Sequence, residues 1–435
     1  MKQPVTIFWF RRDLRLNDNV GLYEALRGDH TVLPIFIFDS DILEKLPEDD
    51  ARVTFIHDTL QNIQSTLKEE HNSSIAMFHG KPIDIFKHLV DSYDIGEVHT
   101  NHDYEPYAKA RDEKIASFLN ENHIEFKTFK DQVVFEKNEI VKKDGNPYMV
   151  YTPYMKLWKS TFRILDFKDF PSEMILKNLI PTTNLPNLSL SDIGFIKSQQ
   201  EIKPYLVTSS LIQNYEATRN FPSQDSTSKL GPHLRFGTVS IRKMVKNAIA
   251  EKNEIFWQEL IWREFFTQIL WHFPYTKNDS FKAKYDRIEW RNNETEFKAW
   301  CEGKTGYPLV DAGMRQLNET GFMHNRVRML VGSFLCKHLL IDWRWGEAYF
   351  AEKLHDYDMA SNVGNWQWVA GCGVDAAPYF RIFNPTTQIQ KFDKDLNYIK
   401  QWVPDFQELT YPMPIVDHKF ARERCLETYK TALNS

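Results

Sequence analysis

The sequence has few cysteines and no long apolar run, and each absence excludes a class of protein. Its 435 residues include four cysteines, with no Cys-x-x-Cys pair and no Cys/His cluster at zinc spacing. We therefore expect a reducing environment and no metal site. No stretch approaches the length of a membrane span, and the apolar residues 5–10 are too few for a signal peptide. The sequence thus predicts a cytoplasmic, bacterial-type protein without a targeting signal or membrane contact.

The sequence also lacks a large excess of charge of either sign. The formal net charge is −5 and charged residues make up 26% of the chain, so the molecule as a whole is not a polycation. Binding to nucleic acid would need a local basic face. Aromatic residues are abundant instead, at 14% with 12 Trp and 31 Phe. They could form a large core or stack on bases or a cofactor ring, and composition leaves both open.

The first third of the chain alternates short apolar runs with helical patterns. We predict strands at 5–10, 32–38, 74–78, 97–101 and 124–129, and helices at 51–67, 82–93 and 105–121. Strands that alternate with helices indicate an α/β domain with a doubly wound, mostly parallel sheet. No G-x-G-x-x-G follows a strand there, so a nicotinamide-dependent oxidoreductase, one rival hypothesis, lacks its fingerprint.

The residue composition of the chain changes after the first third. Proline, asparagine and serine are frequent from Asp166 to Pro204, which predicts a long surface connection. Beyond Pro204 the apolar residues recur at helical spacing, with helices expected at 256–272, 311–320, 326–338 and 346–354. We therefore predict an α/β domain at 1–130, a connection at 131–204 and an all-helical domain at 205–435.

Two predicted helices carry polar side chains on one face. Glu259, Trp262 and Arg263 stand at positions i, i+3 and i+4 and suit a polar aromatic ligand with a nearby phosphate, although a helix with a Glu–Arg surface pair is the commoner explanation. Asn325, Arg328 and Met329 also share a face. Their amide suits a nucleobase edge and their thioether a ring, but a helix end with two solvated arginines is about as common.

A third segment combines carboxylates, an amide and two indoles. Asp356 and Asp358 precede Asn362, and Trp366 and Trp368 follow. If the segment is helical, Asn362 and Trp366 lie one turn apart, and the arginine at 328 could pair with one of the two carboxylates. Taken singly, each Trp is as often a core residue as a functional one.

Two glycine-containing segments need separate interpretations. Residues 227–231 place hydroxyls, a Lys and a Gly before a helical run, an arrangement that binds phosphate at helix N-termini. A capped helix start is the commoner explanation. Residues 371–376 match G-x-G-x-x-A but lie outside any βαβ pattern, so we do not interpret them as a dinucleotide site.

Together these segments resemble the photolyase/cryptochrome family along nearly the whole chain, and within it the class I cyclobutane pyrimidine dimer photolyases. Residues 9–16 look like the family's opening strand and loop, and the strings at 303–317 and 375–385 are highly specific to it. The resemblance implies an N-terminal α/β domain and a C-terminal helical domain that holds FAD in a folded form.

The resemblance also implies roles for individual residues. It places FAD contacts at Tyr215, Thr227, Ser228, Lys229, Leu230, Gly231, Arg328, Asp356, Asp358 and Asn362. It places the pocket for a flipped-out dimer at Glu259, Trp262, Asn325, Met329 and Trp368, and contacts to the DNA backbone at Arg219, Arg263, Arg326, Arg381 and Gln388. An electron relay from the flavin to the surface would run through Trp366, Trp343 and Trp290.

The implied activity is light-driven repair of cyclobutane pyrimidine dimers in UV-damaged DNA. Excited, reduced FAD would donate an electron to the flipped-out dimer, and Glu259 would help to stabilise the dimer's radical anion. Asn362 stands where plant cryptochromes carry Asp, which favours repair. Enzymes that repair (6-4) photoproducts carry His in place of both Asn325 and Met329, so the cyclobutane dimer is the better substrate. We expect a monomer with no obligate protein partner.

Two alternatives stay open at this point. A cryptochrome-type photoreceptor would share the fold and the FAD, but such receptors commonly have a C-terminal extension, and this chain stops at Ser435. Repair of (6-4) photoproducts is the other alternative. A second, light-harvesting chromophore is not identified: residues 104–108 lack the Asn-Glu pair of some folate-binding members, which leaves a deazaflavin, another flavin or none.

Overall fold

The computed structural model describes residues 4–164, 168–251 and 253–434, and the chain forms two compact units. Unit 1 comprises Met1–Glu139, Trp158–Pro204 and Leu230–Ala250, and unit 2 comprises Ile140–Leu157, Tyr205–Lys229 and Glu251–Ser435. The two units therefore interleave along the chain. The predicted domain ranges stay a prediction, and the start of the expected connection at Asp166 lies outside the described residues.

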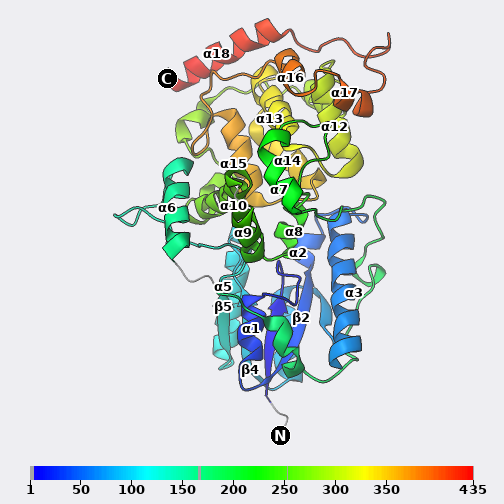
Figure 1. Ribbon diagram of the computed structural model, residues 1–435, viewed down its shortest axis with the longest axis vertical. Coiled ribbons are helices and arrows are strands. Elements are labelled where there is room, and N and C mark those ends of the chain that lie inside the picture. Colours follow the sequence, from blue (N-terminus) through cyan, green and yellow to red (C-terminus); the bar gives the residue numbers. More distant parts are fainter. Residues whose placement is uncertain (1–3, 165–167, 252, 435) are drawn as a thin grey trace. The chain divides into compact units, whose positions relative to one another are not determined.

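Unit 1 contains a five-stranded parallel sheet, which confirms the predicted α/β class (Figure 1). Its strand order is β3-β2-β1-β4-β5, so the order reverses at β1 and the sheet is doubly wound. The strands are β1 (Val5–Phe10), β2 (Thr31–Asp39), β3 (Ala76–Gly80), β4 (Ile95–Asn101) and β5 (Glu125–Phe129).

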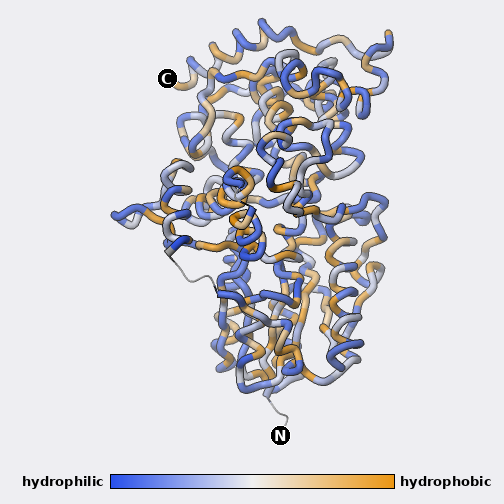
Figure 2. The backbone as a smooth tube through the Cα atoms, in the orientation of Figure 1, coloured by the Kyte–Doolittle hydropathy of each residue, from blue (hydrophilic) through white to orange (hydrophobic). Residues whose placement is uncertain are grey.

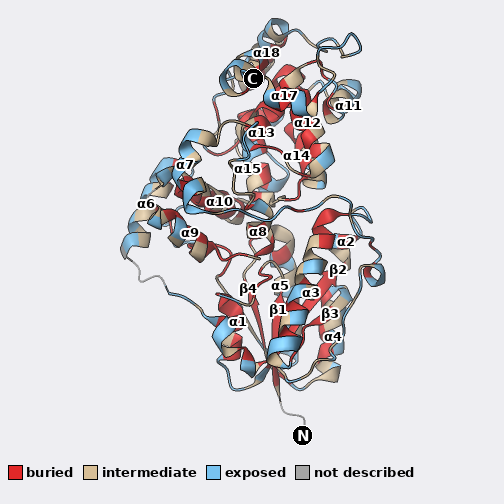
Figure 3. Ribbon diagram, turned by 45° about the vertical axis from the view of Figure 1, so that its right-hand side comes forward, coloured by how far each residue is buried: buried red, intermediate tan, exposed pale blue. Residues whose placement is uncertain are grey.

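Side chains of the central strand β1 alternate between two hydrophobic cores. Phe8 and Phe10 pack with α1 (Val20–Leu26) and α3 (Ala51–His71) on one face. Ile7 and Trp9 pack with α4 (Pro82–Ser92) and α5 (Pro106–Glu121) on the other. Because both faces of a parallel sheet are covered, its strands form nearly continuous apolar runs. Figure 2 shows such a run in orange along β2, and Figure 3 shows these strands as buried.

Unit 1 also contains shorter elements, one between strands β2 and β3 and the others after the sheet. They are α2 (Ser40–Leu43), the turns η1 (Ser172–Asn178) and η2 (Ser191–Ile193), α8 (Gly231–Phe236) and α9 (Ile241–Ala250). Helix α6 (Tyr151–Ile164) begins in unit 2.

Unit 2 is helical, and the described residues after Pro204 contain no strand, as predicted. The helix expected at 326–338 is divided: α13 ends at Ser333 and the π-helical turn η5 (Phe334–His338) comes next. In the part of the chain that the structure describes, no helix has the length and apolar character to cross a membrane. The helices are α7 (Ser209–Thr218), α10 (Glu254–His272), α11 (Glu294–Cys301), α12 (Pro308–Thr320), α13 (Asn325–Ser333), α14 (Trp343–Lys353), α15 (Met359–Ala370), α16 (Pro385–Phe392), α17 (Asn397–Trp402) and α18 (His418–Asn434), with the turns η3 (Pro274–Lys277) and η4 (Ala283–Arg287).

A buried ion-pair network in unit 1 joins segments that are distant in sequence. The Asp131 carboxylate accepts hydrogen bonds from Arg15 at 2.7 Å and from Arg242 at 2.9 Å, and Arg242 also bonds Asp18 at 3.0 Å. Burial alone would raise the pKa of Asp131, but the two guanidinium groups lower it below its usual value. The network therefore ties the loop after β1 and the segment after β5 to α9.

We expect the substitution Asp131→Asn to destabilise unit 1 at neutral pH, because it leaves two buried cations without their anion. The loss of unfolding free energy should be roughly 3–5 kcal/mol. Since the folded-state pKa of Asp131 is lowered, its contribution exists above the unfolded pKa of about 4 and is lost as the pH falls through the folded value. Thermal melts at pH 7.5 and at progressively lower pH should therefore show a gap to the unmodified protein that narrows below about pH 4. A gap that stays constant with pH would contradict this account.

Candidate functional site

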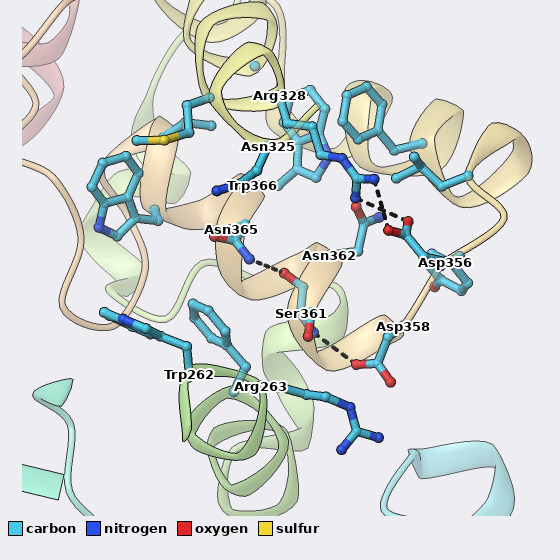
Figure 4. Close-up of a pocket in the computed structure, with 18 of the residues that line it drawn as sticks. Trp262, Arg263, Asn325, Arg328, Asp356, Asp358, Ser361, Asn362, Asn365 and Trp366 are labelled. Carbon is cyan, nitrogen blue, oxygen red and sulfur yellow. Dashed lines mark hydrogen bonds and ion pairs between the residues drawn. The ribbon is translucent and has the colours of Figure 1, made fainter. Parts of the chain in front are cut away.

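Unit 2 contains a cavity of about 370 Å³ that is walled by α10, α13, α15 and the segment before α15 (Figure 4). It brings together predicted site residues from separate parts of the sequence. These are Arg219, Glu259, Trp262, Arg263, Asn325, Arg328, Met329, Asp356, Asp358, Asn362, Trp366 and Trp368. Sequence reasoning missed the other lining residues, which are Phe266, Gly332, Phe350, Leu354, Tyr357, Ser361, Asn365 and Val369.

Helix α10 presents Glu259, Trp262 and Arg263 to the cavity, as the i, i+3, i+4 spacing predicts. The commoner explanation of this spacing was a surface pair of Glu259 with the arginine of its own helix, and the carboxylate has another partner. It instead forms a short ion pair with Arg219, which comes directly after α7. Burial would lower the pKa of Arg219, but the Glu259 carboxylate raises it above its usual value. Both charged groups of this pair line the cavity.

Helix α13 contributes Asn325, Arg328 and Met329 from one face, and Arg328 is paired with a carboxylate. Its Nη1 and Nη2 donate to the two carboxylate oxygens of Asp356 at 3.1 and 2.8 Å, and its Nε donates to the backbone oxygen of Met323 at 2.8 Å. The predicted pairing of Arg328 with a carboxylate is therefore confirmed. Such two-pronged bonds fix the plane of a guanidinium group.

Asp358 caps the N-terminus of helix α15, and its side chain accepts a hydrogen bond from the Ser361 N–H at 3.2 Å. One turn later, Asn362 uses both hydrogens of its amide nitrogen on one neighbour. Its Nδ2 donates to the backbone oxygen of Glu347 at 3.1 Å and to Glu347 Oε1 at 2.9 Å. The Asn362 carbonyl oxygen is therefore the amide atom left to accept a bond from a ligand in the cavity.

The remaining predicted residues lie away from the cavity lining. The Tyr215 ring packs edge-on against Phe256, and burial, with Glu259, raises its pKa to about 12. Arg326 donates to Asn220 Oδ1 at 2.5 Å and lies 4.6 Å from the ring of Phe392. Two further residues belong to the segment after α15: Arg381 is exposed, and Gln388 is half-buried on α16.

The predicted phosphate loop is divided between the two units. Thr227, Ser228 and Lys229 belong to unit 2, whereas Leu230 and Gly231 belong to unit 1 and lead into α8. The Lys229 ammonium bonds Asp225 at 3.0 Å and lies 4.1 Å from the ring of Phe322. The N-cap residue of α8 is Leu230, which makes no side-chain cap hydrogen bond, so this residue does not supply the capped start of the commoner explanation.

The three predicted relay indoles differ in their surroundings. Trp366 lines the cavity and lies in ring contact with Phe350 at 5.0 Å and with Trp300 at 6.2 Å. Trp343 is buried at the start of α14 with a guanidinium group over its ring, and Trp290 packs edge-on against Tyr429. The relay stays a prediction, and the contact of Trp300 with Trp366 is one that sequence reasoning missed.

Comparison with known proteins places this arrangement in a family. Residues 6–174 match the family described as DNA photolyase, and residues 256–410 match the FAD binding domain of DNA photolyase. The chain belongs to the DNA photolyase family. The deoxyribodipyrimidine photo-lyase of Agrobacterium fabrum is 36% identical, with 99% of this chain and 98% of that protein covered. The enzyme of the same name from Escherichia coli is 35% identical, with 98% of each covered.

Solved photolyase and cryptochrome structures share the fold. A bacterial class III photolyase from Agrobacterium tumefaciens superposes with a TM-score of 0.88 at 33% identity, covering 100% of this chain and 99% of that one. An archaeal photolyase from Sulfolobus tokodaii with two FAD molecules superposes with a TM-score of 0.84 at 33% sequence identity. The match covers 98% of this chain and 100% of that one. A Synechocystis cryptochrome superposes with a TM-score of 0.85 at 25% sequence identity, and the match covers 98% of this chain and 99% of that one. The assignment to class I stays a prediction.

The G-x-G-x-x-A string at 371–376 follows helix α15 and not a strand of the sheet. Gly371 ends α15 in the left-handed conformation, and the string belongs to the helical unit. The described residues also include no group of three or more His, Cys, Asp and Glu side chains that could hold a metal. The helical unit of this photolyase-family chain is instead its FAD-binding domain.

Two glycines allow α15 to lie close to its neighbours. A Cβ at Gly346 of α14 would lie 2.1 Å from the Trp366 ring, and a Cβ at Gly364 of α15 would lie 2.2 Å from Phe266. Both distances are far below van der Waals contact. The absence of side chains at these positions therefore sets where α15 places Asn362 and Trp366.

We expect Gly346→Ala to displace Trp366, because the added methyl group meets a ring that is itself packed. The cost should be about 1–3 kcal/mol of unfolding free energy, seen as a lower melting temperature together with a lower content of co-purified flavin. Ala348→Ser, at an exposed position of the same helix, is the control and should stay within about 0.5 kcal/mol. Equal stability and flavin content in Gly346→Ala would show that α15 is not held by this contact.

Proposed function

We propose that this chain repairs cyclobutane pyrimidine dimers in UV-damaged DNA with light and reduced FAD. The observation that carries the proposal is the cavity, which combines a set of residues suited to a flavin with a set suited to a flipped-out pyrimidine dimer. The relatives named deoxyribodipyrimidine photo-lyase, which match along the whole chain, support the same activity.

The polar and apolar groups that line the cavity suit a flavin. Arg328 is held flat by Asp356, the carbonyl oxygen of Asn362 is available as an acceptor, and apolar side chains such as Phe350 and Trp366 form a wall. An acceptor in this position suits a ring N–H of a reduced flavin. When bound, FAD would supply the one-electron photochemistry, and the protein supplies position and electrostatics.

We assign the cofactor contacts accordingly. Arg328, Asp356, Asp358 and Asn362 would surround the ring system and its chain, and the 227–231 segment with Tyr215 would hold the phosphates. The side-chain hydroxyls and the ammonium group of that segment are suitable phosphate partners. The archaeal photolyase with two FAD molecules supports a second, light-harvesting chromophore as an addition to this function.

The remaining cavity residues suit the damaged bases. A dimer inside a duplex cannot reach a cavity, so it must be flipped out, and a damaged pair costs less to unstack. Trp262 and Trp368 would replace the lost base stacking. Glu259 would accept hydrogen bonds from the ring N–H groups of the dimer. Asn325 and Met329, neither of them His, favour the cyclobutane dimer over the (6-4) photoproduct.

Arginines near the cavity would hold the DNA backbone. Arg219 and Arg263 line the cavity, and Arg326 and Arg381 belong to neighbouring segments of unit 2. With Gln388 they form the local cationic set that an acidic protein needs, so binding should weaken as salt rises. Trp366, Trp343 and Trp290 would carry an electron from the surface when the flavin has to be reduced. We further propose that the protein acts in the cytoplasm as a monomer.

A cryptochrome-type photoreceptor is the second candidate, because the Synechocystis cryptochrome shares the fold over 98% of this chain. The two functions differ in how the absorbed light is used. A photoreceptor needs no affinity for a pyrimidine dimer, whereas the proposed enzyme must bind the dimer and reverse it.

The activity assay separates these candidates. We expect the purified protein to contain flavin by its absorption spectrum and, after photoreduction, to restore thymine-dimer oligonucleotides under blue light but not in the dark. Recovery of restriction sites or loss of the dimer peak on chromatography measures repair. If the protein holds fully reduced FAD and still shows no light-dependent repair, the proposed enzyme function is wrong and the photoreceptor takes its place.

The role of Glu259 has its own test. We expect Glu259→Ala to retain FAD and to lower the repair quantum yield at saturating substrate roughly ten- to a hundredfold, since a charged hydrogen-bond acceptor is typically worth roughly 1.5–3 kcal/mol. Glu254→Ala, at the exposed start of the same helix, is the matched control. An unchanged yield in Glu259→Ala would remove Glu259 from the substrate site.

A further inference from the structure

The indole of Trp262 is covered on one face by an aromatic ring from a distant part of the sequence. Tyr151, the first residue of α6, lies parallel to it with the two ring centroids 3.6 Å apart and the planes 8° from each other. Tyr151 is buried, with 6% of its surface exposed, and it is absent from the cavity lining. Tyr151 therefore stands behind Trp262, and the indole meets the cavity with its remaining surface.

Tyr151 is itself held at both ends. Its hydroxyl donates to the backbone oxygen of Gln258 at 2.8 Å, and its backbone N–H donates to Asp375 Oδ2 at 3.1 Å. Burial, together with the nearby Glu259 carboxylate, raises the pKa of Tyr151, so the hydroxyl stays protonated as a donor. The ring thus has little freedom to turn.

The other aromatic neighbours of Trp262 hold it less closely than Tyr151 does. Trp262 is only partly buried, and its other aromatic neighbours lie further off: Phe266 is tilted by 29° at 5.5 Å and Phe265 is edge-on at 5.6 Å. A side chain that must become fixed when a ligand binds reduces the affinity, whereas one that is already fixed does not. Aromatic pairs contribute an orientation-dependent energy beyond simple burial.

We propose that Tyr151 is a positioning residue that fixes the plane of Trp262 in the orientation that stacks on the flipped-out dimer. The inference rests on the proposed repair function, and it assigns to Tyr151 a share in the recognition of damaged DNA. Tyr151 does not touch the substrate. It acts through Trp262, and so it affects binding of the dimer more than the electron transfer and bond breaking.

The test compares three variants in the full-length flavoprotein. Tyr151→Leu removes the ring, Tyr151→Phe keeps the ring but removes the bond to Gln258, and Tyr148→Leu is the matched control in the same segment. The dissociation constant is measured in the dark for an oligonucleotide with one thymine dimer and for the same oligonucleotide without damage. Tyr151→Met, which fills the space with a flexible chain, replaces the Leu variant if that protein does not fold.

We expect Tyr151→Leu to weaken dimer binding roughly three- to tenfold, the range that an aromatic pair contributes. Binding to undamaged DNA, the FAD content and the repair quantum yield at saturating dimer should stay within about twofold of the unmodified protein. Tyr151→Phe and Tyr148→Leu should bind the dimer normally. Unchanged dimer affinity in Tyr151→Leu would overturn the inference, as would a loss of affinity that is equal for damaged and undamaged DNA.

A spectroscopic measurement tests the positioning directly. In protein labelled with 5-fluorotryptophan, the fluorine signal that disappears in Trp262→Phe belongs to Trp262. This signal should shift and broaden in Tyr151→Leu and stay sharp in Tyr148→Leu; a sharp, unshifted signal in Tyr151→Leu would overturn the proposal. If the unmodified protein shows no preference for the dimer, the repair function itself fails, and the fluorine signal still decides whether Tyr151 fixes Trp262.

Discussion

The close approach of α15 to α10 and α14 is the constraint on which the rest of the site depends. Helix α15 supplies the amide at Asn362 and the indoles at 366 and 368, so its position sets three cavity groups at once. It can lie there only because Gly346 and Gly364 leave room for the rings of Trp366 and Phe266. Packed interiors accommodate extra atoms poorly, so this spacing is fixed by the backbone and not by adaptable side chains.

Two ion pairs line the cavity, and they differ in which of their atoms stay available to bind a ligand. The Arg328–Asp356 pair is bidentate and uses both carboxylate oxygens. The Arg219–Glu259 pair uses one carboxylate oxygen. A charged group in apolar surroundings is costly without a partner of opposite charge. Pairing therefore keeps these side chains charged and in place while the cavity holds no ligand. The neutral amide of Asn362 donates through its nitrogen to Glu347, which leaves its carbonyl oxygen to accept a bond.

Local patterns predicted the parts of this molecule that depend on neighbours in sequence. The residues of β1 are evident from its apolar run, and the cavity face of α10 from the spacing of Glu259, Trp262 and Arg263. The contacts that orient those side chains could not be predicted in this way. Glu347 accepts a bond from Asn362 from another helix, and Tyr151 stacks on Trp262 although the two residues are far apart in sequence. Nothing in the periodicity of either segment indicates which ring or carboxylate it will meet.

The abundance of aromatic residues left two explanations open, a large core or a surface for rings, and the structure shows why they were not alternatives. Trp366 is only 3% exposed and belongs to the main hydrophobic core of unit 2, yet its ring also lines the cavity. One layer of rings therefore packs the core on one side and forms the wall of the site on the other. Replacing such a residue removes buried area and site surface together, so stability and function cannot be altered independently there.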